Sequence, residues 1–118
     1  MDEKVVTMAM LFDFFGELLT DKQRDCFDLY YNDDLSLSEI AECRGISRQA
    51  VRDNIVRAEA ALCELEEKTG IVERFESMNK LISELEKDVQ LIIDASDGNS
   101  VLCRTAEDMK LKLKRLKG

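Results

Sequence analysis

A helix can continue through most of this chain, because none of its 118 residues is a proline. Proline is the residue that most strongly breaks a helix interior. Sustained alternation of apolar and polar residues, which indicates strands, is also missing. These features predict an all-α fold with a single helical domain over residues 1–118. The expected helix breaks are the five glycines, Gly16, Gly45, Gly70, Gly98 and Gly118.

The net charge of the chain is −8, and it is distributed unevenly. Residues 1–34 and 61–100 each carry −6, residues 35–60 are neutral, and residues 101–118 carry +4. An acidic protein repels the phosphates of nucleic acids at long range. We therefore expect any binding to DNA or RNA to come from a local basic site and to weaken steeply with salt.

Several classes of function find no support in the composition. The chain has no histidine, the commonest general base, and it shows no nucleophile–base pair and no glycine-rich phosphate loop. We therefore expect neither an enzyme nor a cofactor.

The apolar run near the N-terminus is only about ten residues long and contains Asp13, so we expect no membrane span or signal peptide and a cytoplasmic protein. The four cysteines lack the close spacing of a zinc site, which predicts no metal and four buried free thiols, Cys26, Cys43, Cys63 and Cys103.

Apolar periodicity and capping signals predict the first three helices. The first is expected over residues 3–18, with an apolar face wide enough to contact both the core and a partner chain. Thr20 with Gln23, and Ser36 with Glu39, have the pattern of a capping box. The second and third helices are therefore expected to begin just after Thr20 and Ser36. The apolar face of the first helix comprises Val5, Met8, Leu11, Phe12, Phe14, Phe15, Leu18 and Leu19.

The segment 36–58, SLSEIAECRGISRQAVRDNIVRA, predicts a helix-turn-helix motif. Ala41 lets two helices approach closely, Gly45 permits the positive φ of a sharp turn, and Ser47 caps the next helix. That helix is expected to continue to Thr69 on an apolar stripe. The side chains expected to fill the corner between the two helices are Ile46, Val51 and Ile55.

The second helix of this motif carries the candidate nucleic-acid contacts. In helix-turn-helix proteins its N-terminal part enters the major groove, where arginine reads guanine and glutamine reads adenine. Residues 47–58 have a local charge of +2. The predicted contacts are Ser47, Arg48, Gln49, Arg52, Asp53, Arg44 and Arg57. Two alternatives remain open. Arg44 and Arg57 could pair with the nearby carboxylates of Glu39, Glu42 or Asp53, and the motif could serve packing or protein binding alone.

After Gly70, the sequence predicts a long helix over residues 71–94 with apolar residues in steps of four and three, a heptad seam. At about 1.5 Å per residue this helix is about 36 Å long. We expect part of it to pack antiparallel to the helix before it or to the first helix, and the rest to contact a second subunit in a homodimer. Packing within one chain is the alternative. The predicted dimer interface comprises Phe75, Met78, Ile82, Leu85, Val89 and Ile92, and Ile71 begins the seam.

A loop is predicted at residues 95–100, followed by a short basic helix over residues 101–117. Cations near a helix C-terminus are favourable for the helix dipole. The acidic helix before the loop also offers ion-pair partners to this basic helix. An RNA-binding tail is the alternative interpretation.

The segment LLTDKQRDCFDLYYNDDLSLSEIAECRGISRQAVRDNIVRAEAAL resembles region 4 of bacterial sigma factors. With MAMLFDFFGELLT and the long helix included, the chain resembles more closely the YlxM family of helix-turn-helix proteins. This resemblance implies a sigma region 4-like bundle and carries Ser47, Arg48, Gln49 and Arg52 onto the DNA-reading positions. The family is bacterial and is encoded beside the signal recognition particle GTPase.

The resemblance therefore implies a DNA-binding regulatory protein that acts in or regulates the signal recognition particle pathway. Its implied partners are DNA, the particle's RNA and its GTPase. The alternative is an accessory factor of the GTPase that binds protein or RNA but not DNA. The chain lacks the polymerase-binding region 2 of a sigma factor and has an acidic surface, and both features count against a role in transcription initiation.

Overall fold

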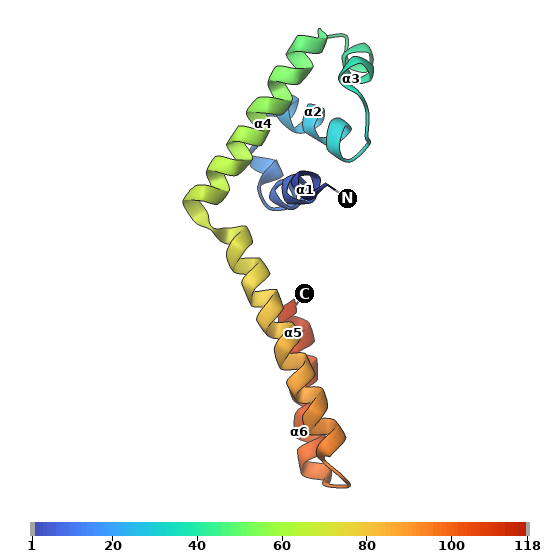
Figure 1. Cartoon of the computed structure of the whole chain (residues 1–118), viewed down its shortest axis with the longest axis vertical. Coiled ribbons are helices and arrows are strands. Elements are labelled where there is room, and N and C mark those ends of the chain that lie inside the picture. The colour runs from blue at the N-terminus through green and yellow to red at the C-terminus, as the bar shows by residue number, and fades with distance from the viewer. Residues whose placement is uncertain (1, 118) are drawn as a thin grey trace. The chain divides into compact units, whose positions relative to one another are not determined.

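The computed structural model describes residues 2–117, which form six α-helices and one short 3-10 helix (Figure 1). The elements are α1 (Glu3–Phe15), η1 (Gly16–Leu18), α2 (Asp21–Tyr31), α3 (Leu37–Arg44), α4 (Arg48–Thr69), α5 (Ile71–Ala95) and α6 (Ser100–Lys117). This described part contains no strand, so the predicted all-α fold is confirmed. None of its helices combines the length and the apolar character needed to cross a lipid bilayer.

The helices are grouped in two compact units, one ending at Val72 and the other beginning at Glu73. The first unit contains α1 to α4 and the first two residues of α5. The second contains the rest of α5 together with α6. The expectation of a single domain over residues 1–118 stays a prediction.

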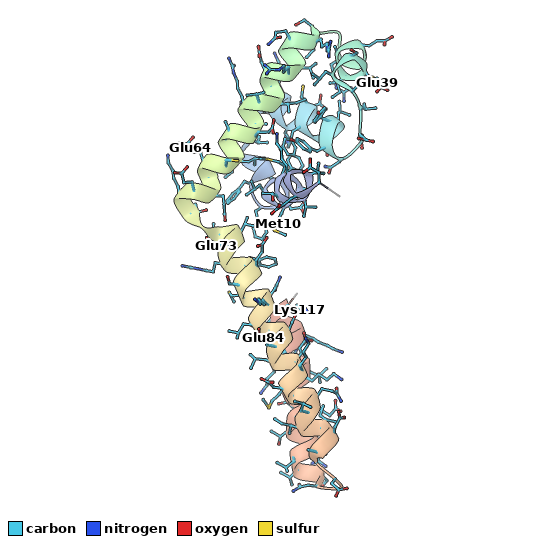
Figure 2. The ribbon with its side chains drawn as sticks, in the orientation of Figure 1. Met10, Glu39, Glu64, Glu73, Glu84 and Lys117 are labelled. Atoms are coloured by element: carbon cyan, nitrogen blue, oxygen red, sulfur yellow. The ribbon has the colours of Figure 1, made fainter. Side chains whose placement is uncertain are left out.

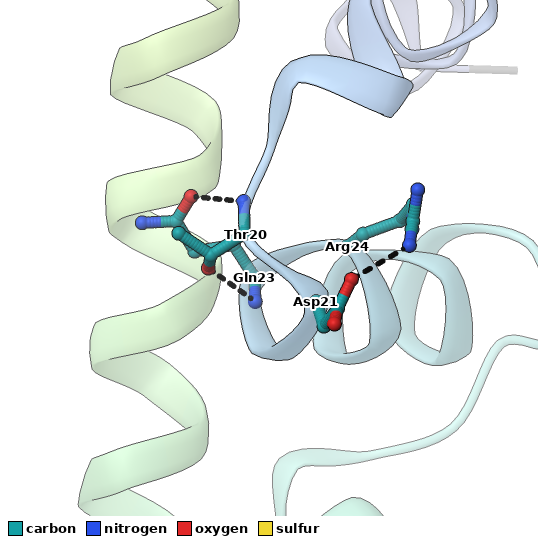
Figure 3. A network of polar contacts seen from close by, with 4 residues as sticks. All are labelled: Thr20, Asp21, Gln23 and Arg24. Carbon is teal, nitrogen blue, oxygen red and sulfur yellow. Dashed lines mark hydrogen bonds and ion pairs between the residues drawn. The ribbon is translucent and has the colours of Figure 1, made fainter.

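The start of α2 is set by a capping box. The Gln23 backbone N–H donates to Thr20 Oγ1, and the Thr20 N–H donates to Gln23 Oε1, both at 3.2 Å (Figure 3). Arg24 pairs with Asp21 in the same turn at 2.9 Å. The box satisfies N–H groups that the first turn of a helix leaves without an intrahelical acceptor. The predicted beginning of α2 is confirmed.

The core of the first unit is centred on Phe27 of α2, which is fully buried. Its ring stacks on Phe12 of α1, with centroids 4.8 Å apart, and contacts the ring of Tyr31 at 4.5 Å. The wide apolar face predicted for the first helix is only partly buried, because Phe14 and Leu18 are exposed. The other buried members of this core are Met8, Leu11, Phe15, Leu19, Ala58, Leu62 and Val72.

α3 and α4 are joined by the tight turn that the sequence predicts. α3 begins in a second capping box, formed by Ser36 and Glu39. It ends at Gly45, whose φ of 66° lies in the left-handed region. The N–H groups of Gly45 and Ile46 both donate to the Ala41 carbonyl, which closes the end of the helix. The helix-turn-helix geometry is therefore built by local hydrogen bonds and one glycine.

The corner between α3 and α4 is filled differently from the prediction. Ile46, expected to plug it, is 39% exposed and lies at its rim. Cys26 of α2 is 2% exposed and occupies the corner instead. The physical reason is that α2 packs against both α3 and α4, so that its own side chain reaches the space between them. Cys26 packs there with Ile40, Val51 and Ile55.

The four cysteines are free thiols, as predicted, but only Cys26 is buried. Burial raises the pKa of the Cys26 thiol, and the nearby Asp25 adds to this shift. Cys43 and Cys63 are exposed and Cys103 is partly buried, so the prediction of buried thiols is wrong for these positions. Cys43 and Cys63 lie on outward faces of α3 and α4, which apolar composition alone does not reveal.

α5 and α6 form an antiparallel helical hairpin, with α6 running back alongside α5 (Figure 1). Ile82 and Val89 of α5 pack against Ala106 and Leu113 of α6. The sequence assigned an earlier helix as the partner of α5, whereas the second unit uses α6. A short loop places consecutive helices side by side, and α6 carries its own apolar stripe.

One side of the hairpin is joined by polar contacts. Lys110 Nζ donates to Gln90 Oε1 at 3.2 Å. Lys117, labelled in Figure 2, contacts both Ser83 Oγ and Glu86 Oε1 at 3.1 Å. These bonds support the interpretation of the basic helix as a partner of the acidic helix.

The predicted heptad seam is divided by this packing. Ile82 and Val89 lie beneath α6 and are therefore left out of the dimer proposal developed below. The other seam residues are 41% to 51% exposed: Ile71, Phe75, Met78, Leu85 and Ile92.

Candidate nucleic-acid interface

The candidate site begins at the N-terminus of α4. Ser47 has extended backbone angles, with φ −72° and ψ 155°, and its Oγ accepts the Ala50 N–H at 3.0 Å. The prediction of Ser47 as the cap is confirmed. The first N–H groups of a helix lack intrahelical acceptors and form its positive end, which suits a phosphate oxygen.

The buried face of α4 determines which side chains point outward. Val51 and Ile55 are almost completely buried in the first unit. Because a helix repeats every 3.6 residues, the intervening side chains project away from this core. The exposed residues of this part of α4 are Arg48, Gln49, Arg52, Asp53, Val56 and Arg57.

Arg48 and Arg52 are one helical turn apart and line the same shallow depression. Gln49 of α4 and Leu37 of α3 also line this depression. No ion pair within 2–117 connects either arginine to a carboxylate. Both guanidinium groups are therefore available for a negatively charged ligand.

Arg44 has a different role from the other arginines of the motif. Its Nε and Nη2 bond the two carboxylate oxygens of Asp25 at 2.6 and 3.0 Å. The hydrogen bond to Asp25, together with the charge of that carboxylate, raises the pKa of Arg44. The pair connects α2 to the end of α3. Arg44 thus pairs with a carboxylate, as the alternative proposed, but the partner is Asp25 of α2 and none of the nearby residues expected.

Two more of the predicted contacts have partners on α4 itself. The Gln49 side-chain amide donates to Asp53 Oδ1 at 2.9 Å, one turn further along the helix. Asp53 therefore orients Gln49 and uses one of its two amide N–H groups, which leaves the other N–H and the amide oxygen for a base. Arg57 is exposed two turns after Gln49 and forms no ion pair with any described carboxylate.

A cluster beside Arg52 was not predicted. Glu59 of α4 accepts a hydrogen bond from the Tyr31 hydroxyl at 2.9 Å and pairs with Lys4 at 3.1 Å. Burial raises the pKa of Tyr31, and the hydrogen bond to Glu59 adds to the shift. Arg52 and these three residues line one depression at the edge of α4. The contact joins residues 28 positions apart, so local spacing gives no signal for it.

Comparison with known families places this geometry in context. The family model described as "UPF0122: Putative helix-turn-helix protein, YlxM / p13 like" matches residues 2–97, which contain α1 to α5. A UPF0122 protein of Shouchella clausii is 46% identical over 111 residues, covering 94% of this chain and 97% of the relative. A UPF0122 protein of Bacillus cereus (strain AH187) is 47% identical over 105 residues, covering 89% and 93%. A Thermoanaerobacter relative is 45% identical over 92 residues, covering 78% and 79%.

Proposed function

The chain belongs to the UPF0122 family of YlxM/p13-like helix-turn-helix proteins, and from this premise we propose that it is a DNA-binding regulatory protein. The observation that carries the proposal is the exposure of Arg48 and Arg52 at the start of α4, without a carboxylate partner among the described side chains. In helix-turn-helix proteins this part of the second helix contacts the base edges.

The proposed complex has α4 in the major groove. Arg48 and Arg52 contact guanine edges or phosphates, and Gln49, oriented by Asp53, contacts adenine. Ser47 and the first N–H groups of α4 hold a phosphate at the helix N-terminus. Arg57, further along the helix, meets the DNA backbone. The proposal thus keeps Arg44 in its pair with Asp25, as a residue that positions α3 and not as a contact.

The net charge of −8 limits the strength of this binding. The acidic remainder of the chain repels phosphates, so the basic site alone supplies the attraction. Each phosphate neutralised by an arginine contributes about −0.9 to the slope of log affinity against log salt. We therefore expect measurable binding at low salt, with a steep loss as salt is added.

We further propose that the process regulated is the signal recognition particle pathway. The support for this step is the resemblance of the sequence to the YlxM family, and the candidate nucleic acids are promoter DNA and the particle's RNA. The proposal places the protein in the cytoplasm, where both are found.

An electrophoretic mobility-shift experiment at several salt concentrations tests the proposed site, with random duplex DNA and the particle's RNA as probes. Arg48→Glu combined with Arg52→Glu is expected to abolish binding to the preferred probe. The matched control, Arg104→Glu with Arg115→Glu, makes the same change of net charge on exposed positions of α6 and is expected to retain binding. Unchanged affinity of the first variant refutes the site. Loss of binding only in the control would show that the basic helix α6, and not α4, contacts the nucleic acid.

A second candidate function is an accessory factor of the signal recognition particle GTPase that binds protein or RNA but not DNA. The acidic charge of residues 61–100 and the exposed apolar side chains of α5 favour it. A pull-down with the GTPase, with and without the particle's RNA, distinguishes the two. The second function is supported if the GTPase retains the protein equally well with and without Arg48→Glu and Arg52→Glu, and if the protein does not bind DNA.

A further inference from the structure

The α5–α6 hairpin has an apolar side that no described residue of the second unit covers. On α5, Met78, Leu81, Leu85 and Ile92 are exposed and follow one another in steps of three, four and seven residues. On α6, Leu102, Met109 and Leu116 are exposed and lie seven residues apart. Such spacing keeps side chains on one face of a helix. Each of the seven is between 41% and 65% exposed.

The two stripes lie on the same side of the hairpin. On α5, the buried pair Ile82 and Val89 separates the polar flank that contains Ser83, Glu86 and Gln90 from the flank that contains the apolar stripe. On α6, the buried pair Ala106 and Leu113 separates Lys110 and Lys117 from the second stripe in the same way. The hydrogen bonds of Lys110 and Lys117 join the two polar flanks. The two apolar flanks must therefore meet on the opposite side and form one surface.

This surface contains more hydrophobic side chains than the core between the two helices of the hairpin. The hairpin buries four hydrophobic residues between its helices, Ile82, Val89, Ala106 and Leu113, and leaves seven exposed on this one side. A pair of helices with an uncovered apolar face is half of a layered structure, because stable architectures bury such a face against another element.

The charges of the two helices indicate what covers the surface. From Glu73 onward α5 carries six acidic and three basic residues, whereas α6 carries six basic and two acidic residues. A second hairpin of the same kind, turned by a two-fold axis along the helices, sets each acidic α5 against the basic α6 of the other copy. The alternative two-fold axis, across the helices, sets α5 against α5 and opposes like charges.

We propose that two copies of this chain associate through these surfaces and form an antiparallel four-helix bundle, with α5 of each copy against α6 of the partner subunit. The seven side chains of the two stripes form the interface. This inference does not depend on nucleic-acid binding. It differs from the interface expected from the sequence, since it adds α6 and Leu81 and omits Phe75, Ile82 and Val89.

In the proposed bundle, an ion pair between the two subunits forms at the border of the apolar surface. Asp88 is exposed and lies seven residues after Leu81, at the outer edge of the stripe on α5. Lys112 lies at the corresponding edge on α6, where it pairs with Asp108 of its own helix at 3.1 Å. In the antiparallel arrangement Asp88 and Lys112 of the partner subunit are at a similar height along the bundle.

Sedimentation equilibrium of the full chain tests the association with matched substitutions. Leu85→Lys on α5 and Met109→Lys on α6 place a charge on the apolar surface and should yield the monomer mass of 13.5 kDa. Leu91→Lys and Leu111→Lys change residues that are at least as exposed but face away from this surface, and they should remain dimeric like the parent. Circular dichroism of each variant checks that the helices are retained. A monomeric parent protein, or dimers in all four variants, overturns the proposal.

A charge exchange tests which helices meet. Asp88→Lys and Lys112→Glu should each raise the dimer dissociation constant about threefold to thirtyfold, and the two together should restore it. Asp88→Lys also lowers the magnitude of the net charge, so a general relief of repulsion would strengthen the dimer. Failure of the double substitution to recover the parent affinity refutes the pairing of α5 with α6 of the partner subunit.

Discussion

Replacing Gly45 with alanine tests the turn that presents α4. Gly45 has φ 66° and ψ 33°, a conformation that costs an L-residue with a Cβ atom about 1 to 2 kcal/mol. A Cβ atom built at Gly45 has no heavy atom within 4 Å, so no steric clash adds to this cost. We therefore expect Gly45→Ala to lower the free energy of unfolding of the first unit by about 1 to 2 kcal/mol.

Two further substitutions separate the backbone cost from other effects. Gly70 also has a left-handed φ, of 62°, and open space around its Cβ position, so Gly70→Ala should cost a similar amount. Asparagine tolerates the left-handed region better than alanine, and Gly45→Asn should lose clearly less stability than Gly45→Ala.

Urea unfolding followed by tyrosine fluorescence measures these effects in the first unit. Both tyrosines of the chain, Tyr30 and Tyr31, lie in α2. With a slope of about 1.5 kcal/mol per molar urea, the expected loss moves the midpoint by about 1 M. A Gly45→Ala midpoint equal to that of the parent, or an asparagine variant as unstable as the alanine variant, would show that the turn does not need a left-handed residue.

Three other perturbations follow from contacts in the first unit. Thr20→Ala removes one half of the capping box with Gln23 and should cost about 1 kcal/mol in urea unfolding; Thr20→Ser, which keeps the hydroxyl, should lose much less. Phe27→Ala removes the ring at the centre of the core and should lower the free energy of unfolding by about 3 to 5 kcal/mol. Near-ultraviolet circular dichroism should then show unfolding at a much lower urea concentration, or no cooperative unfolding transition. The pKa of Tyr31 is raised above its ordinary value of 10.0 by burial and by the bond to Glu59. The contribution of Tyr31 to the free energy of unfolding is therefore fully present below pH 10 and is lost as the pH rises further. The stability of Tyr31→Phe should therefore fall less steeply than that of the parent between pH 10 and higher pH in urea titrations, and equal slopes would contradict the assignment.

The features that the sequence predicts correctly are governed by local interactions. The capping boxes at Thr20 and Ser36 and the cap at Ser47 use bonds that span three residues, so the residue types and their spacing are sufficient. The turn at Gly45 likewise depends on one backbone angle. The burial of Val51 and Ile55 follows from helical period. For these reasons the beginnings of α2, α3 and α4 and the helix-turn-helix motif could be predicted from the sequence alone. The predicted end of the first helix is wrong, because α1 ends at Phe15 and residues 16–18 form a 3-10 helix.

The features that were not predicted depend on contacts between distant residues. Arg44 forms its ion pair with Asp25, which is 19 positions away in the sequence, although carboxylates lie closer to it along the chain. Cys26 displaces Ile46 from the corner because α2 crosses both helices of the motif. The seam of α5 has correct spacing, yet periodicity does not identify which helix covers it. Tertiary packing decides each of these cases, and helical period leaves the choice of partner open.

The central claim, that the N-terminal part of α4 contacts DNA, is tested most directly by nuclear magnetic resonance of the isotope-labelled full chain. Duplex DNA is added stepwise at low salt, and the backbone amide shifts are followed residue by residue. We predict that the largest shifts occur within residues 47–57 and that Arg48→Glu with Arg52→Glu removes them. Shifts confined to α6, or no shifts at DNA concentrations that retard the protein in gels, would contradict the account.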